Sequence, residues 1–248
     1  MNILVANSRG GGMRELIPKH IIEKVDFWPG AKLNQISCMA IKNIISHRLG
    51  EDTHVYILGG IPDIMQKLKD NKYEEVIFTE SEEHTISRIT AEIDSISSKI
   101  KSVGAIPIFC TICTINIEKW NTARLHQIKT KQLKYTYQYN YMQQTLNSTI
   151  DTINKHIINT NKSNNMHTPL THKTIKHAKG NGKYTYKYNL LNDGVHANEE
   201  AKMDWAKTII HAVSLNRMSD MEEEQEPKRE WKAERHKAMT EKPNYFTI

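Results

Sequence analysis

Short apolar runs, each followed by a glycine-containing turn and then by apolar residues at helical spacing, constrain the fold of this chain most strongly. The clearest runs are Asn2–Ala6, His54–Leu58 and Ala105–Ile115. They are apolar almost throughout, which is typical of strands covered on both faces of a sheet. The repeated order of strand, turn and helix therefore predicts a three-layer α/β/α sandwich with a mainly parallel sheet of about five strands.

The segments between these runs show where helices are expected. Their apolar residues recur every three or four positions, which is the spacing of a helix with one buried face. Helices are expected over 13–24, 31–47, 84–103, 121–159 and 197–215, with a short helix after Gly60 and short strands at Val25–Trp28 and Glu75–Phe78. The polar segment 160–182 is expected to be a loop.

The length of 248 residues fits one large domain followed by a tail. We assign residues 1–216 to the domain. Residues 217–248 are dominated by Glu, Lys and Arg and contain too few apolar residues to build a core, so they are expected to form a mobile tail or a solvated helix.

Charge and cysteine content bear on partners and compartment. Lysine and arginine exceed the acidic residues by 34 to 28, which favours anionic partners without specifying one. Three cysteines cannot all pair, and two of them lie in apolar runs, so a reducing, intracellular compartment is expected. No segment has the pattern of a signal peptide or of a membrane span. Oligomeric state is not indicated.

Cys110 and Cys113 have the spacing of a metal-binding pair. They lie in an apolar strand candidate without a second ligand pair, so we interpret them as thiols of the core. The scattered histidines have no ligand spacing. No metal and no cofactor are expected.

Ser8 is the first candidate for chemistry. It follows the first strand and precedes three glycines, so its hydroxyl is expected at the carboxyl edge of the sheet, where such folds bind ligands. The alternative is a serine that caps a helix. A phosphate-binding loop is a further rival, but the run lacks the Gly-Lys-Ser/Thr ending of such loops.

Asp193-Gly194-Val195-His196 is the second candidate. A carboxylate three residues before an imidazole can orient it, and an oriented imidazole can take a proton from a serine hydroxyl. The alternative is that Asp193 caps the helix expected from Ala197, with His196 in solvent.

The order of these segments resembles the four blocks of the SGNH (GDSL-type) hydrolase superfamily. Ser8 follows the first strand, Gly30 follows the second, and Gly60 with Asp63 follows the third. The Asp193 to His196 turn precedes the last helix. The arrangement is also similar to the esterase-like domains carried by some mobile genetic elements, which have a Pro-Gly-Ala segment after the second strand.

This resemblance implies a flavodoxin-like fold and the hydrolysis of a small acyl ester. Ser8 would attack the carbonyl carbon, His196 would act as the base, and Asp193 would orient His196. The backbone N–H groups of Ser8 and Gly30 would form the oxyanion hole. Asn7, Gly60 and Asp63 would line the site.

Two positions depart from the superfamily pattern. Asn7 stands where an aspartate usually precedes the nucleophile, and Pro62 stands where an asparagine usually supplies an oxyanion donor. Proline has neither a side-chain nor a backbone donor, and the loss of one such donor costs about 10²- to 10³-fold in turnover. A slow esterase or deacetylase is therefore expected. The alternative is a catalytically retired binding or structural module of a virus or mobile element, which would engage nucleic acid or protein through its basic surface.

Nucleic acid is a candidate partner of the segment Lys129–Tyr141, which interleaves lysines and tyrosines. Such a segment can present cations and stacking faces to a single strand. The alternative is that the tyrosines pack one face of a helix while the lysines remain in water.

Overall fold

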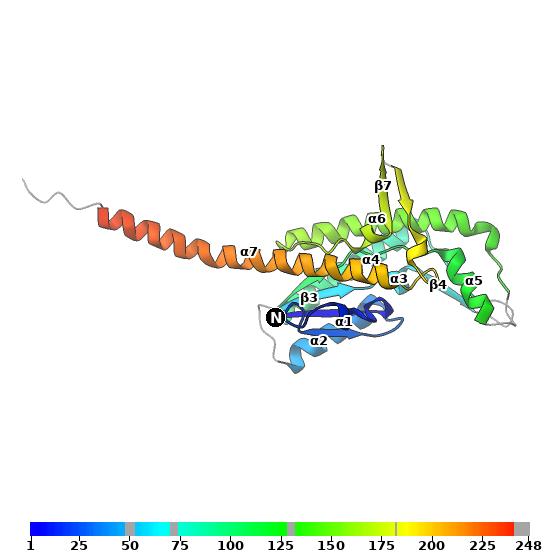
Figure 1. The fold of residues 1–248 in the computed structure, drawn as a ribbon, viewed down its shortest axis with the longest axis horizontal. Coiled ribbons are helices and arrows are strands. Elements are labelled where there is room, and N and C mark those ends of the chain that lie inside the picture. The colour runs from blue at the N-terminus through cyan, green and yellow to red at the C-terminus, as the bar shows by residue number, and fades with distance from the viewer. Residues whose placement is uncertain (48–52, 70–73, 128–131, 182, 241–248) are drawn as a thin grey trace, which may run out of the picture.

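The protein, described here as a computed structural model (Figure 1), is built on four parallel strands in the order β2–β1–β3–β6. The structure describes residues 1–47, 53–69, 74–127, 132–181 and 183–240, with the backbone alone at 126–127 and 220–240. The strands are Asn2–Ala6 (β1), Lys24–Phe27 (β2), Thr53–Leu58 (β3) and Ala105–Phe109 (β6). The expected α/β class with a mainly parallel sheet is confirmed.

The segment expected to add a further strand lies outside this sheet. Glu74–Ile77 (β5) pairs antiparallel with Gln66–Lys69 (β4) in a separate two-stranded sheet. The central sheet therefore has four strands in the described residues, against about five expected.

The central sheet is buried on both faces because its apolar side chains alternate between two cores. In β1, Ile3 and Val5 belong to one core, whereas Leu4 and Ala6 belong to the other. Full burial of each large aliphatic side chain contributes about 1.5 to 3 kcal/mol. This two-sided burial explains why the strands are apolar almost throughout.

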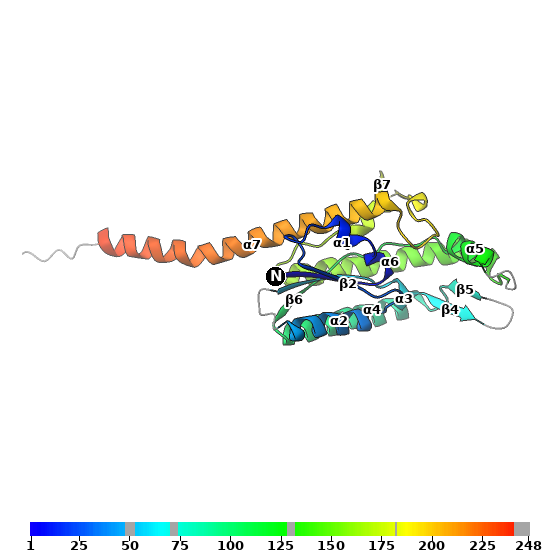
Figure 2. The same cartoon turned by 60° about the horizontal axis from the view of Figure 1, so that its bottom comes forward.

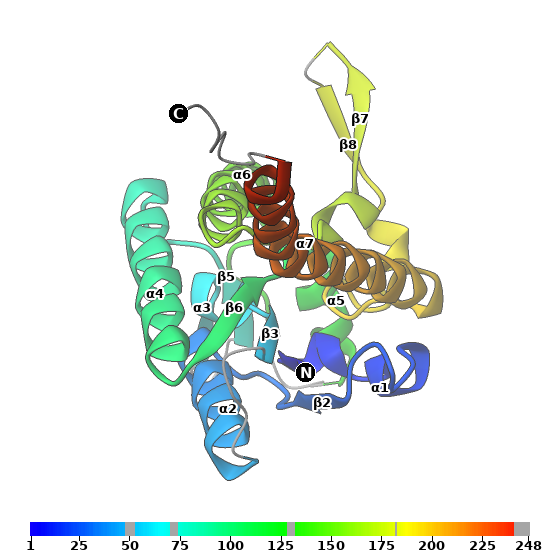
Figure 3. The same ribbon diagram turned by 90° about the vertical axis from the view of Figure 1, so that its left-hand side faces the viewer.

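Helices complete the two outer layers, as Figures 2 and 3 show. Buried residues of α2, α4 and α6 form the first core with the sheet, and those of α1 and α7 form the second. The helices are Met13–Leu16 (α1), Leu33–Ser46 (α2), Ile61–Ile64 (α3), Glu82–Ser102 (α4), Ile117–Gln127 (α5), Tyr139–Ser163 (α6) and Glu199–Thr240 (α7).

The first helix is shorter than expected over 13–24, because α1 ends at Leu16. The next residue, Ile17, is extended, with φ −105° and ψ 118°. Pro18 follows it, and a residue before proline is disfavoured in helical conformation. Proline therefore ends this helix well before residue 24.

The single helix expected over 121–159 is wrong. α5 ends at Gln127, residues 128–131 lie outside the described part of the chain, and α6 begins at Tyr139. The buried carboxylate of Glu75 holds the segment between the helices, since it accepts hydrogen bonds from the N–H groups of Lys134 and Tyr135 at 2.8 and 3.1 Å and from the Tyr139 hydroxyl at 2.5 Å. These tertiary bonds override the helical period of the sequence.

The loop expected over 160–182 is confirmed only for residues 164–175, which contain no α-helix or strand apart from the short 3-10 helix Thr171–Thr174. α6 continues to Ser163, and Lys176–Gly180 (β7) pairs antiparallel with Lys183–Tyr186 (β8) in a hairpin. Gly180 and Asn181 have φ values of +87° and +49° at its turn, a conformation that glycine and asparagine tolerate.

The last helix, α7, begins on the body and runs continuously to Thr240. Its last described contacts with the body are made by Arg217, whose Nη2 donates to the carbonyl oxygens of His20 and Ile21 at 3.0 and 3.2 Å. Beyond that point the helix projects away from the sheet (Figure 1). Within the described part of the chain, no helix combines the length and the hydropathy needed to cross a bilayer.

Candidate active site

The turn after β1 presents the Ser8 side chain. Asn7 donates its N–H to the carbonyl of Leu58 at 3.1 Å, and its side-chain oxygen accepts the N–H of Arg9 at 3.0 Å. Asn7, and not Ser8, therefore caps the short 3-10 helix Ser8–Gly10. The interpretation of Ser8 as a helix cap is thereby excluded, and within the described part of the chain its hydroxyl has no hydrogen bond.

The loop before α7 orients the His196 imidazole. The Asp193 carboxylate accepts the N–H groups of Val195 and His196 at 3.0 and 2.8 Å through Oδ1, and its Oδ2 lies 2.7 Å from His196 Nδ1. A proton on Nδ1 donates to the carboxylate and leaves Nε2 as the acceptor. This is the tautomer that a general base requires.

These hydrogen bonds keep the Asp193 carboxylate ionised. Burial raises its pKa, but the hydrogen bonds from the His196 side chain and from the backbone of His196 and Val195 outweigh burial and lower the pKa to about 2. Asp193 is therefore a carboxylate at every pH where the protein would work.

The alternative role for Asp193, capping the last helix, does not fit the structure. α7 begins at Glu199, and the Asn198 side chain accepts the N–H of Ala201 at 2.9 Å. Asn198 is thus the residue that caps the helix. This leaves the Asp193 carboxylate to His196 and to its own loop.

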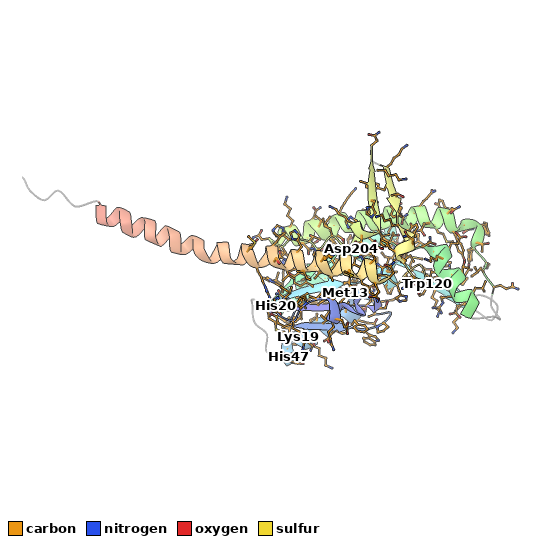
Figure 4. The ribbon with its side chains drawn as sticks, viewed as in Figure 1. Met13, Lys19, His20, His47, Trp120 and Asp204 are labelled. Atoms are coloured by element: carbon orange, nitrogen blue, oxygen red, sulfur yellow. The ribbon has the colours of Figure 1, made fainter. Side chains whose placement is uncertain are left out.

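Gly194 fixes the loop against α5. Its φ is +93°, and a Cβ atom there would lie 2.6 Å from the carbonyl oxygen of Asn116 and from the backbone nitrogen of Trp120. Only glycine allows this close approach. The Trp120 ring in turn lies 5.7 Å from the His196 ring (Figure 4 labels Trp120 on α5), so the imidazole is packed as well as hydrogen-bonded.

The turn after β2 brings Gly30 to the same region. The N–H of Ala31 donates to the carbonyl of Trp28 at 3.1 Å, with Pro29 and Gly30 between them. Gly30 has φ +73°, and proline followed by a glycine at positive φ is the pattern of a type II turn. This turn explains the Pro-Gly segment in the sequence.

A cavity of about 860 Å³ joins the predicted site residues. Ser8, Gly30, Asp63 and His196 line it, together with Pro62. Asp193 lies behind His196, while Asn7 and Gly60 are not among the lining residues. The structure thus brings Ser8 and His196 to one cavity, although no hydrogen bond joins their side chains among the described residues.

Two backbone donors are available beside Ser8. Within the described residues, the N–H groups of Ser8 and Gly30 have no protein acceptor. Pro62 lines the cavity in the first turn of α3, where it fits because that turn needs no N–H donor. At position 62, where the superfamily pattern has an asparagine, no polar side chain therefore faces the site.

Asp63 has a structural partner. Its two carboxylate oxygens accept the N–H of Leu33, the first residue of α2, at 3.1 and 3.0 Å. Burial raises its pKa to about 6, and the hydrogen bond from Leu33 and the charge of Lys32 only partly oppose this. Asp63 therefore links the third-strand turn to the start of α2 and lines the cavity from that position.

Arg9 was not singled out from the sequence. It is buried, and its guanidinium donates to the carbonyl oxygens of Cys113 and Thr114 at 2.7 and 3.3 Å. Burial lowers its pKa, while the negative charge of Asp193 opposes that change. Arg9 thus ties the Ser8 turn to the chain after β6; its only signal in the sequence is a cation placed between Ser8 and the glycines.

A second unexpected group is a cluster of charges to which two residues that line the cavity, Lys67 and Arg124, belong. Lys67 and Arg124 both contact Glu74 Oε1, at 3.1 and 2.6 Å. The Arg124 guanidinium also lies 5.5 Å from the Trp120 ring. Hydrogen bonds from Arg124 and Lys67 lower the pKa of Glu74. Nothing in the local sequence pattern indicates this pairing, because the partners come from separate segments.

Cys110 and Cys113 belong to the apolar core that contains Trp205. Burial raises the pKa of the Cys113 thiol to about 11, which opposes the thiolate form that a metal requires. In the residues that the structure describes, no three His, Cys, Asp or Glu side chains are arranged to hold a metal ion.

Comparisons with known proteins identify the fold. No protein-family model matches the chain, and no curated protein matches its sequence. Solved structures do match it. A GDSL-like lipase from Bacteroides thetaiotaomicron VPI-5482 aligns with a TM-score of 0.55 at 13% identity, over 86% of this chain and 87% of that one.

Two further structures agree with this result. A putative acylhydrolase from Bacteroides fragilis NCTC 9343 aligns with a TM-score of 0.56 at 14% identity, over 86% of each chain. A putative lipolytic protein of the G-D-S-L family from Desulfitobacterium hafniense DCB-2 aligns with a TM-score of 0.53 at 12% identity, over 85% of this chain and 98% of that one. The chain therefore has the fold of the GDSL-type (SGNH) hydrolases.

Proposed function

We propose that the protein is a serine hydrolase that cleaves a small acyl ester at the cavity lined by Ser8 and His196. The observation that carries the proposal is the meeting of these two side chains at one cavity, with the Asp193 carboxylate on Nδ1 of the imidazole. Their positions in the sequence are 188 residues apart, so the fold alone unites them.

In the proposed reaction, Nε2 of His196 takes the proton of the Ser8 hydroxyl as the oxygen attacks the carbonyl carbon of the ester. The imidazolium then gives this proton to the leaving alcohol, and an acyl-enzyme remains. Water, deprotonated by His196, attacks the acyl carbonyl carbon; the bond to the Ser8 oxygen breaks, the carboxylic acid leaves, and His196 returns the proton to that oxygen. The reaction requires the Ser8 hydroxyl to come within hydrogen-bond distance of Nε2 when substrate binds, and catalytic hydrogen bonds in unliganded sites are often long or poorly aligned.

The N–H groups of Ser8 and Gly30 stabilise the negative charge that develops on the carbonyl oxygen. They are backbone donors, and their direction is fixed by the turns after β1 and β2. Pro62 adds no donor to this pair. We therefore expect turnover about 10²- to 10³-fold below that of a site with a third donor.

The same Pro62 favours a second candidate function, a retired hydrolase site that only binds its ligand. The Ser8 and His196 side chains make no hydrogen bond to each other in the described residues, which also fits this alternative. The two functions can be distinguished at Ser8, because hydrolysis requires a reactive hydroxyl there and binding alone does not.

Hydrolysis of p-nitrophenyl acetate by the full chain tests the proposal. Ser8→Ala and His196→Ala are each expected to lower turnover by at least about 10³-fold, because the residues of a triad act as a unit. Ser98→Ala, which removes an exposed hydroxyl on α4, is the matched control and should retain full turnover. Equal rates for the wild type and Ser8→Ala would favour the retired site.

A further inference from the structure

A long segment that lies between Ser8 and the Asp193 loop in the sequence contains positively charged side chains and no negatively charged ones. From Thr152 to Asn192 the sequence contains seven lysines and no aspartate or glutamate. The net charge of the entire chain is +6, so this segment accounts for the whole positive excess. The seven are Lys155, Lys162, Lys173, Lys176, Lys179, Lys183 and Lys187.

The β7–β8 hairpin displays this charge away from the body. It stands out from the layers of the sandwich in two views at right angles (Figures 1 and 3). Lys179 and Lys183 near its turn, and Lys173 and Lys187 at its base, are exposed. Among the described ion pairs, an acidic partner is found only for Lys176, which contacts Asp151 at 2.5 Å.

One face of the hairpin is aromatic. The strand register pairs Ala178 with Tyr184 and Lys176 with Tyr186, so both tyrosines lie on the same face, with a small residue opposite Tyr184. Lys176 Nζ lies 3.7 Å from the centre of the Tyr184 ring. Tyr186 stacks on Tyr188 at 5.6 Å and 8°. This aromatic row packs against the body at Tyr186 and Tyr188 and ends in the open at Tyr184, which is 52% exposed.

We propose that the β7–β8 hairpin binds single-stranded nucleic acid. Unpaired lysines at the edges of the hairpin are placed to neutralise backbone phosphates, and the exposed Tyr184 ring offers a stacking face for a base. This combination of a cationic track with an aromatic platform is what a single strand requires. The proposal concerns a surface separate from the cavity and does not depend on ester hydrolysis.

The composition of the hairpin turn favours nucleic acid over an anionic membrane. The residues at the turn are Lys179, Gly180, Asn181 and Lys183. None of them has an apolar side chain that could enter the acyl region of a bilayer, and stable membrane binding needs such burial besides charge.

The Lys129–Tyr141 segment is less suited to this role. The Tyr139 ring is buried, and its hydroxyl donates to Glu75 at 2.5 Å, so it cannot stack on a base. Tyr137 and Tyr141 are exposed, but Lys129 and Lys131 lie outside the described residues. We therefore place the nucleic-acid surface on the hairpin instead.

Fluorescence anisotropy with a labelled 20-nucleotide single strand tests the proposal on the full chain. The double variant Lys179→Glu/Lys183→Glu reverses two exposed charges at the turn. The matched control, Lys42→Glu/Lys99→Glu, makes the same change in net charge on exposed positions of α2 and α4. Because all four positions are exposed, both variants should keep the melting temperature of the wild type.

The hairpin variant should weaken binding by at least about tenfold at 100 mM salt. It should also lower the slope of log affinity against log salt by about 1.4, the value for two phosphate contacts on a single strand. The control variant should retain both values within about twofold. Equal losses in the two variants would overturn the proposal, since they would show a long-range effect of net charge. Binding of the wild type to phosphatidylserine vesicles but not to the oligonucleotide would overturn it as well.

Substitutions at Tyr184 separate the contribution of base stacking to the affinity from that of charge. Tyr184→Ala should weaken binding by about 5- to 150-fold with an unchanged salt slope, which corresponds to the loss of one stacked base. Tyr184→Phe retains the ring and should restore the affinity of the wild type. If Tyr184→Phe binds as weakly as Tyr184→Ala, the hydroxyl and not the stacking face is responsible, and the proposed mode of binding is wrong.

Discussion

At the scale of single residues, the candidate site depends on contacts that hold one imidazole. Asp193 binds both the Nδ1 atom and the backbone N–H of His196, so the side chain and its loop share one anchor. The carboxylate stays ionised because these hydrogen bonds outweigh the cost of burial. The orientation of His196 is therefore built into the loop before any substrate binds.

Replacing this carboxylate tests the orientation. In Asp193→Asn, the amide oxygen can keep the backbone hydrogen bonds, but the amide nitrogen then faces Nδ1 and favours the wrong tautomer. We expect kcat for p-nitrophenyl acetate to fall by up to about 10⁴-fold with little change in KM. The control is a single cooperative unfolding transition above the assay temperature; the melting temperature at pH 7 should itself fall, because the lowered pKa of Asp193 means that the ionised carboxylate stabilises the fold. A variant with normal kcat would show that Asp193 does not orient the base.

A substitution at Pro62 is expected to raise kcat, which tests whether a missing oxyanion donor limits turnover. Pro62→Asn introduces a side-chain donor on the cavity wall, in the first turn of α3. If Pro62 limits turnover, this change should raise kcat by about tenfold or more, toward the 10²- to 10³-fold that one oxyanion donor contributes. Pro62→Ala restores only the backbone N–H and serves as the matched control. Equal kcat values in the two variants would mean that the added amide does not reach the oxyanion.

At the scale of elements, the turns after the strands carry the site, and two of them depend on glycine. Gly30 and Gly194 both have positive φ, yet their surroundings differ. A Cβ atom at Gly30 would meet no atom within 4 Å, whereas one at Gly194 would collide with the backbone of α5.

This difference predicts unequal losses of stability. Gly30→Ala should lower the free energy of unfolding by about 1 to 2 kcal/mol, the cost of the left-handed conformation. Gly194→Ala should cost more than that, because backbone atoms at 2.6 Å must also move. Urea unfolding measures both values. A smaller loss at Gly194 than at Gly30 would contradict the described contact between the loop and α5.

The link between α3 and α2 predicts a pH dependence. Folding raises the pKa of Asp63 to about 6, so between about pH 4 and 6 the folded protein binds this proton more tightly than the unfolded chain does. The stabilisation is complete below pH 4 and is lost as the pH rises through 6. Its upper bound is about 3 kcal/mol.

Asp63→Asn removes this titration and keeps one acceptor for the Leu33 N–H. Melting curves from pH 4 to 7.5 should show that the wild type loses stability relative to Asp63→Asn as the pH rises. A constant difference between the two proteins across this range would contradict the raised pKa.

The sequence predicts the elements best where burial is continuous. The strands Asn2–Ala6 and Thr53–Leu58 and the helix over 84–103 were expected within about two residues, because their patterns reflect burial on the sheet. The strand expected over Ala105–Ile115 ends at Phe109, because the apolar residues that follow it are buried without belonging to the sheet. The break before α6 could not be predicted, since it depends on Glu75, a residue far away in the chain. The hairpin had a local signal that we missed, because Asn181-Gly182 is a strong turn dipeptide.

Part of the candidate site could be predicted from the order of the strands and helices. Ser8, Gly30 and His196 each follow or precede an element at the sheet edge, so the order of elements is enough to bring them together. Arg9, Trp120 and Arg124 were missed because their contacts join segments that no sequence pattern connects.

At the scale of the whole molecule, the body of the protein and the projecting part of α7 are distinct. The second core includes α7 residues as far as Val213, and Asn216 still hydrogen-bonds the Tyr56 hydroxyl at 3.0 Å. Beyond Arg217 the helix leaves the body (Figure 1). The 1–216 domain is therefore a proposal about where independent folding ends.

A chain that ends at Ser219 tests that proposal. It keeps the Arg217 contacts with the turn before β2, so we expect its melting temperature to stay within about 2 °C of the full chain, less than a 1 kcal/mol loss would produce. Light scattering on the same pair shows whether the removed segment assembles the protein, since oligomer size should then fall. A large drop in melting temperature would mean that the segment belongs to the fold.

The proposed function requires that the fold bring the Ser8 hydroxyl within reach of His196, which acts as its base. A fluorophosphonate reacts much faster with an activated serine than with an ordinary one, and trypsin releases Ser8 in a peptide that ends at Arg9 and has no other hydroxyl residue. Mass spectrometry of the treated full chain should find the phosphonyl group on that peptide in the wild type and not in His196→Ala. An unmodified peptide in the wild type, or equal modification in both proteins, would contradict the proposed function.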